Sequence, residues 1–513
     1  MISKKDKKVI LINTSMPSDV DLNPLTPHLG LLALGTYIKN SNFQPILFDS
    51  RKYITSDFWQ ELKPLLDDAL CVCLSVMTAQ VNSGIEISKK IRESFPNIPI
   101  IWGGFHPSLF PEQTLKDSLV DFVIQGEGDW SFLDLLNELS SDLKNFEKID
   151  GLGYKKDGKI IFNPQEKFHD INELPNWDWS LTDVDSFLEI GTWSDPTKIK
   201  QLSIQTSRGC PFMCTFCINT TLKCYRKWRT RDVDKVVDEI EHLIKEYNIE
   251  WINFRDEIFF LTKERIINFC NEIIKRGIKV RWWCNSRVNF FTCGVIDDEV
   301  MSKLKESGCV NLSFGVESGS PRILQLLRKG ITPNQVIKSA QVCNKYGIKP
   351  IYSFIAGLPS ETKEDLMLTY KLMKDIINNC PSAMLLGPHL YRPYPGCELY
   401  EIAKKFGVPE AKELREWPRI TDESFNESSD PIEKGAHTFD GLPWVYDQNF
   451  VKAFITYARY ASYNPLILFR TKRYFMGIQS AIAKLRFSTN FFRFIGIERK
   501  IKDSFRNMLH YLN

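Results

Sequence analysis

Three cysteines, Cys210, Cys214 and Cys217, have the types and spacing that most clearly predict chemistry in this 513-residue chain. Thiolates on one short loop can each bind one iron of a cuboidal iron–sulfur cluster. No fourth cysteine follows at short spacing, so one iron would keep an open coordination position, as catalytic metal sites do. Gly209 and Pro211 flank the first cysteine and suit a backbone that bends closely around a ligand.

Two other interpretations of these cysteines stay open on spacing alone. They could be part of a structural zinc site, which needs a fourth cysteine or histidine nearby, and Cys224 is the candidate for that position. They could also be three buried thiols without a ligand. The other cysteines are scattered, which does not predict a disulfide framework.

The cysteine stretch at 208–217, Arg-Gly-Cys-Pro-Phe-Met-Cys-Thr-Phe-Cys, resembles the signature of the radical S-adenosylmethionine (SAM) enzymes. In that family the open iron binds the amino and carboxylate groups of SAM, and an electron from the cluster cleaves SAM to a 5′-deoxyadenosyl radical. The resemblance implies a 4Fe–4S cluster on Cys210, Cys214 and Cys217, with Phe216 packed near the adenine.

The elements before this loop predict a doubly wound, Rossmann-like domain over residues 1–149, because short apolar runs alternate with amphipathic stretches. We expect strands at 8–13, 44–49, 70–76, 98–102 and 120–124, and helices at 28–40 and 83–95. Ligands of such sheets bind at the carboxyl ends of the strands. Glycines follow two of these ends, in Gly-Gly-Phe-His-Pro (103–107) and Gly-Glu-Gly-Asp (126–129).

This glycine pair, ahead of a radical SAM loop, resembles the cobalamin-binding domain of the cobalamin-dependent radical SAM enzymes. The DxHxxG motif that gives cobalt a histidine in other cobalamin proteins is absent, and neither His28 nor His106 fits it. The resemblance therefore implies a lower face of cobalamin without histidine, which favours methyl transfer. Plain turns of an α/β sheet are the alternative for the glycines, and turn residues are the alternative for Ser75 and Thr78. The predicted cobalamin contacts are Ser75, Thr78, Gly103, Gly104, His106, Gly126, Glu127 and Gly128.

Residues 150–200 lose the alternation and predict a linker, with a hairpin turning at Asp157-Gly158 and a proline-containing connector at 172–179. From 201 to 409 the alternation returns and suits the partial (β/α)6 barrel of the radical SAM family. The predicted strands lie near 201–206, 250–256, 279–287, 310–317, 349–356 and 383–391, and helices near 232–246, 263–276, 297–307, 333–346 and 362–379.

The carboxyl ends of these strands carry residues that resemble the SAM contacts of the family. Arg229 and Arg231 match a recurrent Arg-x-Arg just past the cluster loop. Each residue alone could instead be a cap or part of an ion pair. Cys397 stands where the family often has threonine, and an incidental small residue is the favoured interpretation. The predicted SAM contacts, in addition to Phe216, are Asp256, Glu257, Arg287, Glu317, Ser318 and Gly357.

The C-terminal region, 410–513, is predicted to be mostly helical and is basic at its end. Residues 448–513 hold 12 Lys and Arg against 2 Asp and Glu, whereas the whole chain carries a net charge of +3. Such a segment could lie on an anionic membrane or pack on the barrel with its cations outward. Trp417 and Trp444 are candidate walls of a substrate pocket. No signal peptide and no membrane-spanning window are evident, so we expect a cytoplasmic protein, with membrane contact at most peripheral.

Together the motifs predict a cobalamin-dependent radical SAM enzyme, with a methyltransferase that acts on an unactivated carbon through methylcobalamin as the leading hypothesis. A non-methylating enzyme that forms or rearranges rings is the alternative, and a non-catalytic cobalamin sensor is a third. A methylthiotransferase would need three more N-terminal cysteines, where only Cys71 and Cys73 occur. The expected partners are a small-molecule, lipid or peptide substrate and an electron donor such as flavodoxin or ferredoxin, with no nucleic acid.

Overall fold

The computed structural model describes most of the chain as two compact units. Unit 1 comprises residues 1–211, 218–257 and 409–426, and unit 2 comprises 212–217, 258–408 and 427–513. The described residues are 7–16, 26–53, 57–142, 144–167, 169–192, 195–419, 442–463 and 474–489.

Unit 1 contains a seven-stranded sheet with the order β2-β1-β3-β4-β5-β6-β7. The first five strands are parallel, and the β6–β7 hairpin continues the sheet in antiparallel fashion. The reversal of strand order between β1 and β3 is the switch point at which doubly wound sheets bind ligands. The strands are β1 Lys8–Asn13, β2 Gln44–Asp49, β3 Ala69–Ser75, β4 Ile100–Gly103, β5 Phe122–Ile124, β6 Leu152–Lys156 and β7 Lys159–Phe162.

Helices follow the parallel strands of this sheet; the sequence predicted the two at 29–40 and 81–94 and missed the others given below. Their apolar faces cover buried strands such as β1, whose Val9–Ile12 side chains are fully buried. The helices are α1 Leu29–Asn40, α2 Phe58–Leu62, α3 Val81–Ser94, α4 Phe105–Leu109, α5 Pro111–Lys116 and α6 Asp129–Leu139. The Rossmann-like fold predicted for the N-terminal part of the chain is confirmed.

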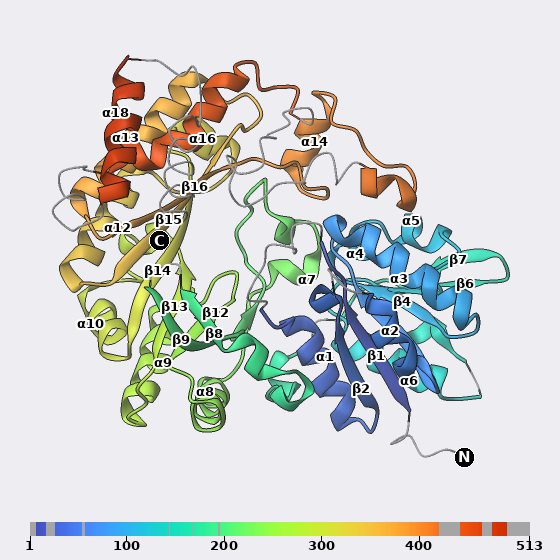
Figure 1. The fold of residues 1–513 in the computed structure, drawn as a ribbon. Coiled ribbons are helices and arrows are strands. Elements are labelled where there is room, and N and C mark those ends of the chain that lie inside the picture. The colour runs from blue at the N-terminus through green and yellow to red at the C-terminus, as the bar shows by residue number, and fades with distance from the viewer. Residues whose placement is uncertain are drawn as a thin grey trace, which may run out of the picture. The chain divides into compact units, whose positions relative to one another are not determined.

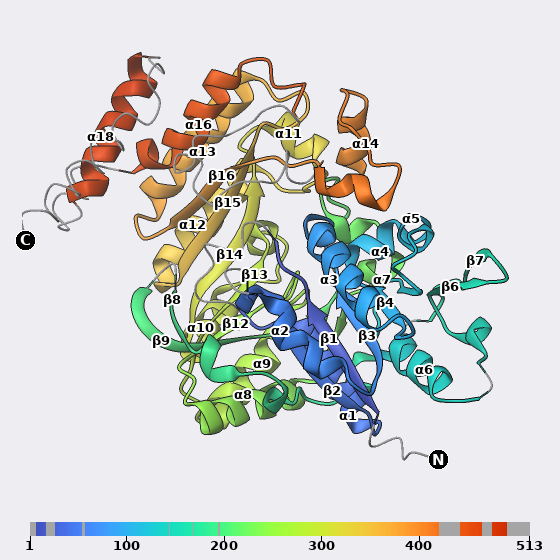
Figure 2. The ribbon, with the colours of Figure 1, turned by 45° about the vertical axis from the view of Figure 1, so that its right-hand side comes forward.

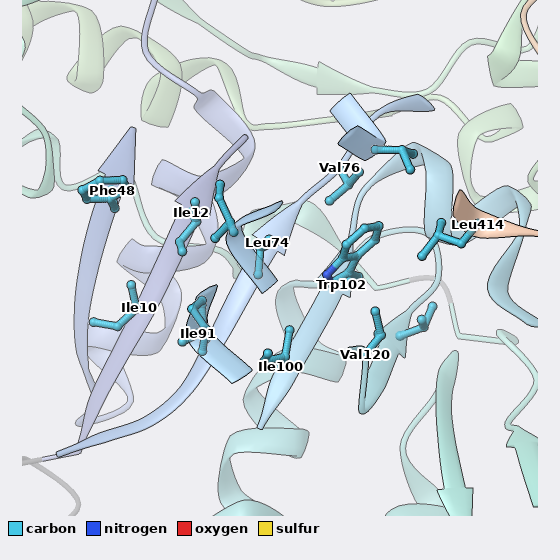
Figure 3. Close-up of a cluster of buried hydrophobic side chains, with 14 of the residues drawn as sticks. Ile10, Ile12, Phe48, Leu74, Val76, Ile91, Ile100, Trp102, Val120 and Leu414 are labelled. Carbon is cyan, nitrogen blue, oxygen red and sulfur yellow. The ribbon is translucent and has the colours of Figure 1, made fainter. Parts of the chain in front are cut away.

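One of the two apolar clusters of this sheet includes residues from far along the chain. Ala411, Leu414 and Trp417 pack with Trp102 and Leu74 in the same buried cluster. Figure 3 shows Leu414, on the orange segment, beside Trp102 at the end of the blue strands. The segment 409–419 is therefore a structural part of unit 1.

The later strands of the chain follow the order β16-β15-β14-β13 in unit 2 and β12-β9-β8 in unit 1. Strands β13 to β16 are parallel neighbours within unit 2, and β9 and β12 pair in parallel within unit 1. The strands β13 to β16 lie side by side in Figures 1 and 2. The strands are β8 Glu189–Thr192, β9 Asp195–Ile204, β12 Trp251–Phe254, β13 Arg281–Ser286, β14 Cys309–Glu317, β15 Lys349–Ala356 and β16 Met384–Leu390.

The helices between these strands confirm the βα alternation of the half-barrel. The sequence missed α11, whose six residues are too few for a visible helical period, although Pro321 and the cap Ser320 mark its start. The helices are α7 Lys223–Arg226, α8 Val233–Tyr247, α9 Lys263–Lys275, α10 Asp298–Glu306, α11 Pro321–Leu326, α12 Pro333–Tyr346 and α13 Lys363–Asn379.

Three more described helices follow: α14 Glu398–Lys404, α16 Gln448–Ser462 and α18 Tyr474–Thr489. Helix α16 packs on β16, α13 and α18, and buries Phe450, Phe454 and Ala458. Much of the basic region, including the stretches at 468–473 and 491–494, lies outside the described residues. Among the residues that are described, no helix has the length and apolar character needed to cross a bilayer.

The predicted linker 150–200 begins with the β6–β7 hairpin, which turns at Asp157-Gly158 as expected and extends the first sheet. The hairpin joins the sheet because β6 pairs with β5. The domain borders predicted at 149, 200 and 409 stay predictions.

Candidate cofactor sites

Cys210 lies directly after a short antiparallel pair, β10 (Ser207–Arg208) and β11 (Arg229–Thr230). Its amide donates a hydrogen bond to the Tyr225 carbonyl at 2.8 Å. Gly209 has φ +87°, and a Cβ there would lie 2.4 Å from the Lys227 carbonyl oxygen. Only glycine allows this approach, so the backbone before Cys210 is held tightly against residues 225–227.

Cys214 and Cys217 lie on a turn closed by a hydrogen bond from the Cys217 amide to the Cys214 carbonyl at 3.1 Å. Thr215 fixes this turn within unit 2. Its amide and hydroxyl donate to the Leu327 and Leu326 carbonyls at the end of α11, both at 3.0 Å. Its carbonyl accepts from the Leu399 amide at 2.8 Å. Cys214 is buried and Cys217 half-buried.

The donor set fits a three-cysteine cluster better than a four-ligand zinc site. None of the three cysteines forms a disulfide. Burial raises the pKa of the Cys224 thiol to about 11. In the described parts of the chain no three Cys, His, Asp or Glu side chains gather closely enough to hold a single metal ion. Three thiolates that each bind a separate iron do not need such a gathering.

Two aromatic rings of the cysteine loop lie against cations from the half-barrel. The Arg287 guanidinium, at the end of β13, lies 3.7 Å from the centroid of the Phe212 ring. The Lys329 ammonium lies 5.3 Å from the centroid of the Phe216 ring. Arg287 also donates to the Lys329 carbonyl. These cation–π contacts place the predicted SAM residues Phe216 and Arg287 in one group.

Glu317 completes this group from the end of β14. It has φ +69°, which is unusual for a residue other than glycine and marks strain of the kind found at functional sites. Its carboxylate pairs with the Lys329 ammonium at 2.9 Å, and both side chains are about nine-tenths buried. Sequence reasoning missed Lys329, because it follows an unpredicted helix rather than a strand. The Arg-Lys-Gly stretch at 328–330 was the available signal.

Asp256, predicted to contact SAM, is buried at the end of β12. Its Oδ1 accepts from the Thr206 amide at 2.9 Å and hydroxyl at 3.0 Å, and from the Ser207 hydroxyl at 2.5 Å. Burial raises its pKa to about 7. These three hydrogen bonds fix Thr206 and Ser207, which lie between the end of β9 and the cysteine loop. Glu257 follows as an exposed residue.

Ser318 and Gly357, both predicted to contact SAM, form hydrogen bonds with other residues of unit 2. The Ser318 hydroxyl is buried and lies 3.1 Å from the Thr369 hydroxyl, so it braces the turn after β14. Gly357 has φ +78°, its amide donates to Glu361 at 2.7 Å, and its carbonyl accepts from the Trp444 indole at 2.8 Å. Trp444 is therefore a buried anchor of the turn after β15, which corrects the expectation of a pocket wall.

Cys397 does not have the properties of a second reactive cysteine. It is buried at the start of α14, and its thiol donates to the Tyr394 carbonyl at 3.3 Å. Burial raises the pKa of this thiol further above its ordinary value, which keeps it in the less nucleophilic neutral form. The geometry favours the interpretation of an incidental small residue.

The glycines at the strand ends of unit 1 are half-buried, and Gly103 among them has open space beside its backbone. Gly103 ends β4, and a Cβ there would meet nothing within 4 Å. Gly104 has φ +98° and packs against the Val76 backbone, where a Cβ would lie at 3.0 Å. Gly126 has φ +71°, and Gly128 caps α6. Open space at Gly103 fits a ligand that approaches the backbone closely at this edge.

Neither histidine of this domain offers a ready metal ligand. His28 caps α1: its Nδ1 accepts from the Leu31 amide at 3.1 Å, so the neutral ring donates from Nε2 to the Ser75 hydroxyl at 3.0 Å. Burial lowers the pKa of His28 to about 4 and that of His106 to about 3. His106 is fully buried against Phe110 and Trp417. The predicted cobalamin contact of His106 stays a prediction.

Ser75 and Thr78 lie where the sequence predicted, just past β3. The Ser75 hydroxyl accepts from His28 and keeps its own proton for another partner. Thr78 is buried, with its hydroxyl 3.4 Å from His106 Nδ1. Their contact with a cofactor stays a prediction.

Glu127, another predicted cobalamin contact, is paired inside the protein. Its carboxylate binds Arg229 and lies 3.5 Å from Arg208. The neighbouring Asp129 accepts from both terminal nitrogens of Arg208 at 2.5 and 3.3 Å. Arg231, the second residue of the Arg-x-Arg pair, binds the buried Glu239 at 2.7 Å. These side chains serve as internal ion pairs.

Trp417 is not the wall of a substrate pocket. It is 1% exposed in the apolar cluster of the first sheet, and its indole donates to Gln113 at 2.5 Å. Arg415 from the same segment pairs with Asp117 at 2.7 Å. The large apolar side chain of Trp417 indicates a buried residue, but the sequence does not indicate that it packs against the first sheet.

Two stretches of this sequence match known protein families. Residues 22–136 match the B12 binding domain, and residues 204–373 match the Radical SAM superfamily. The chain is 32% identical to an uncharacterized methyltransferase of Pyrococcus horikoshii, over 74% of this chain and 78% of the relative. It is 27% identical to an anaerobic magnesium-protoporphyrin IX monomethyl ester cyclase of Rubrivivax gelatinosus, over 72% of this chain and 64% of that protein.

A solved structure supports the fold. The radical SAM methyltransferase TsrM of Kitasatospora setae, bound to tryptophan and a SAM analogue, aligns with a TM-score of 0.66. The alignment covers 81% of this chain and 83% of TsrM at 18% identity, which shows the arrangement of the fold alone.

The fold and the sites define an enzyme with a cobalamin-binding domain followed by a radical SAM half-barrel. This chain belongs to the family of cobalamin-dependent radical SAM enzymes. The cofactors of the family are a 4Fe–4S cluster, SAM and cobalamin, and the donor chemistry described above fits each of them.

Proposed function

We propose that this protein is a methyltransferase that places a methyl group on an unactivated carbon of its substrate. Support comes from the relative with 32% identity, which is named a methyltransferase, whereas the cyclase relative is less similar. When bound, the cofactors supply radical hydrogen abstraction and a methyl carrier, and the protein positions them.

The observation that carries this proposal is the state of the two N-terminal histidines. Both ring nitrogens of His28 are hydrogen-bonded within unit 1, and His106 is fully buried among aromatic rings. Neither imidazole is therefore available to cobalt without rearrangement of the core. A cobalamin without a histidine on its lower face is the arrangement that favours methyl transfer.

The proposed roles of the residues follow from their surroundings. Cys210, Cys214 and Cys217 hold the cluster. Phe216 lies beside the adenine, and the charged groups of Arg287, Glu317 and Lys329 bind the polar groups of SAM. Charge-assisted hydrogen bonds from a half-buried arginine and a buried ion pair suit an amino-acid headgroup, which carries both signs of charge.

On the cobalamin side, the strand ends at Gly103, Gly104, Gly126 and Gly128 form the edge where the cofactor binds. The Ser75 hydroxyl is the proposed hydrogen-bond donor for it, because His28 supplies the proton that the Ser75 oxygen accepts. These glycines end or follow β4 and β5, and Ser75 ends β3, the strand that borders the topological switch point of the sheet.

The products of SAM test the proposal. With substrate and reductant, we expect 5′-deoxyadenosine and S-adenosylhomocysteine in about equal amounts, because one SAM is cleaved and another gives its methyl group. Both products are measured by liquid chromatography in single time courses. The triple variant Cys210→Ala, Cys214→Ala, Cys217→Ala is the control and should form no 5′-deoxyadenosine.

Other outcomes would favour the alternatives. A ring-forming enzyme would give 5′-deoxyadenosine without matching S-adenosylhomocysteine. A non-catalytic cobalamin sensor would bind cobalamin and cleave no SAM under reducing conditions.

A radical SAM protein needs a reductant and a substrate. We propose a flavodoxin or ferredoxin as the reductant, and a small molecule, lipid or peptide as the substrate. Contact of the basic region 448–513 with an anionic membrane stays a proposal. Its helix α16 packs on α13, β16 and α18 and is buried over most of its length, and this packing favours the alternative in which that helix covers the barrel.

A further inference from the structure

Two arginines stand directly opposite each other next to the first cluster cysteine. Arg208 on β10 and Arg229 on β11 are partners in the antiparallel register, and Arg208 precedes Cys210 by two residues. Like charges at directly opposed positions of a ladder repel and destabilise it. The pair β10–β11 therefore depends on negative charge supplied from elsewhere.

Two carboxylates at the start of α6 supply that charge. Asp129 accepts from both terminal nitrogens of Arg208, and Glu127 binds Arg229 and lies 3.5 Å from Arg208. The side chains of all four residues are between 6% and 16% exposed. A bidentate, largely buried arginine–carboxylate pair fixes geometry as well as charge.

The two carboxylates lie next to Gly126 and Gly128, which together with Gly103 and Gly104 form the glycine-rich edge of the first sheet. The Gly126 amide, next to Glu127, donates to the Ser108 hydroxyl at 2.9 Å. Ser108 in turn donates to the Gly104 carbonyl at 2.7 Å. Two hydrogen bonds thus link Gly104 to Gly126 through Ser108, and the next residue in the chain, Glu127, lies 3.5 Å from Arg208, two residues before Cys210.

We propose that Asp129 and Glu127 are positioning residues for the cluster-binding hairpin, a role that rests on the proposed function of Cys210 as an iron ligand. They neutralise Arg208 and Arg229, keep β10 paired with β11, and so hold Cys210 where its amide meets the Tyr225 carbonyl. The glycine-rich edge of the cobalamin domain thereby sets the backbone of the cluster loop.

A double-mutant cycle on the full-length, anaerobically reconstituted, cobalamin-loaded protein tests this proposal. The variants are Asp129→Asn, Arg208→Gln and the two combined, and the measurement is the rate of iron loss to a ferrous chelator. We expect each single variant to lose iron at least about tenfold faster, because the remaining charge of the pair is left buried without its partner. The double variant should be no faster than either single variant, because both remove the same interaction.

Two controls separate positioning from general stability. Asp134→Asn removes an exposed carboxylate from the same helix and should lose iron at the wild-type rate. Cobalamin content is measured on every sample and should stay close to wild type in the Asp129 variant. The unfolding temperature of each sample shows that the variant is folded at the temperature of the assay. Glu127→Gln is a second variant, for which the same faster loss is expected if Asp129→Asn does not fold.

The results that would overturn the proposal are distinct. Additive effects in the double variant, wild-type iron loss in the Asp129 and Glu127 variants, or iron loss that only parallels cobalamin loss would each contradict it. Wild-type protein that takes up no iron would overturn the proposed function as well.

Discussion

Burial decides what the charged and titratable residues of this protein can do. The Lys329–Glu317 pair keeps both charges in a largely buried place beside Phe216, which is costly unless the charges are paired. His28 and His106 avoid the free-energy cost of a buried charge because they are neutral: burial lowers their pKa values to about 4 and 3.

The lowered pKa of His28 predicts how stability depends on pH. Its pKa of about 4 in the folded protein lies below the ordinary 6.5, so the unfolded chain binds more protons between these values. The stabilisation is complete above pH 6.5 and is lost as the pH falls toward 4. Between pH 7.5 and 5.5 the wild type should lose about 1 kcal/mol more than His28→Asn, measured by urea unfolding.

Asparagine is chosen for this variant because it keeps an N-cap acceptor for the Leu31 amide. His242→Asn changes an exposed histidine on α8 and should leave the wild-type pH dependence in place. An identical pH dependence in His28→Asn and wild type would show that His28 is not held neutral.

At the scale of elements, the short β10–β11 pair and the following Gly209 fix the backbone conformation at the start of the cysteine loop. Gly209→Ala would add a Cβ 2.4 Å from the Lys227 carbonyl oxygen at φ +87°. Gly294→Ala is a matched control, since Gly294 has φ +84° and open space around its Cβ position. The control should cost about 1 kcal/mol of stability and keep its iron. The Gly209 variant should lose most of its iron on reconstitution, measured by iron content per chain.

Equal iron content in the two glycine variants would show that the close approach at Gly209 does not matter for the loop. Loss of iron in both would indicate that backbone strain alone is responsible. The pair of variants thus isolates the contact with residues 225–227.

The same scale shows how far the sequence could predict the fold. Strands such as β1 and β15 were predicted to within a residue or two because continuous or alternating apolar runs have one interpretation in a parallel sheet. Helix α11 was missed because it has only six residues. The hairpin at Asp157-Gly158 was recognised from its turn, but its pairing with β5 was not, since pairing partners leave no local signal.

The candidate site was predictable where a motif carries it and not where distant residues meet. The cysteines and Glu317 stand in local patterns, but Lys329 approaches Glu317 only through the turn after α11. Glu127 was predicted as a cofactor contact because it stands between two glycines. Its pairing with Arg229, 102 positions away, depends on the tertiary fold.

At the scale of the whole molecule, the chain leaves the half-barrel and returns to the first sheet. Residues 409–419 bring Leu414 and Trp417 into its core, and Trp417 packs edge-on against His106 at a ring separation of 5.5 Å. The cobalamin-binding domain is therefore completed by a segment far from it in sequence. Its match to the B12 binding domain ends at residue 136, well before this segment.

The central claim concerns the enzyme as a whole: a methyl group of SAM reaches a carbon of the substrate. The most direct measurement uses SAM with a deuterated methyl group and the metabolites of a strain that lacks the gene, incubated anaerobically with the reconstituted enzyme and a reductant. Mass spectrometry should find a metabolite that gains one labelled methyl group, in proportion to the 5′-deoxyadenosine formed. A product that accumulates with 5′-deoxyadenosine but carries no label would contradict methyl transfer.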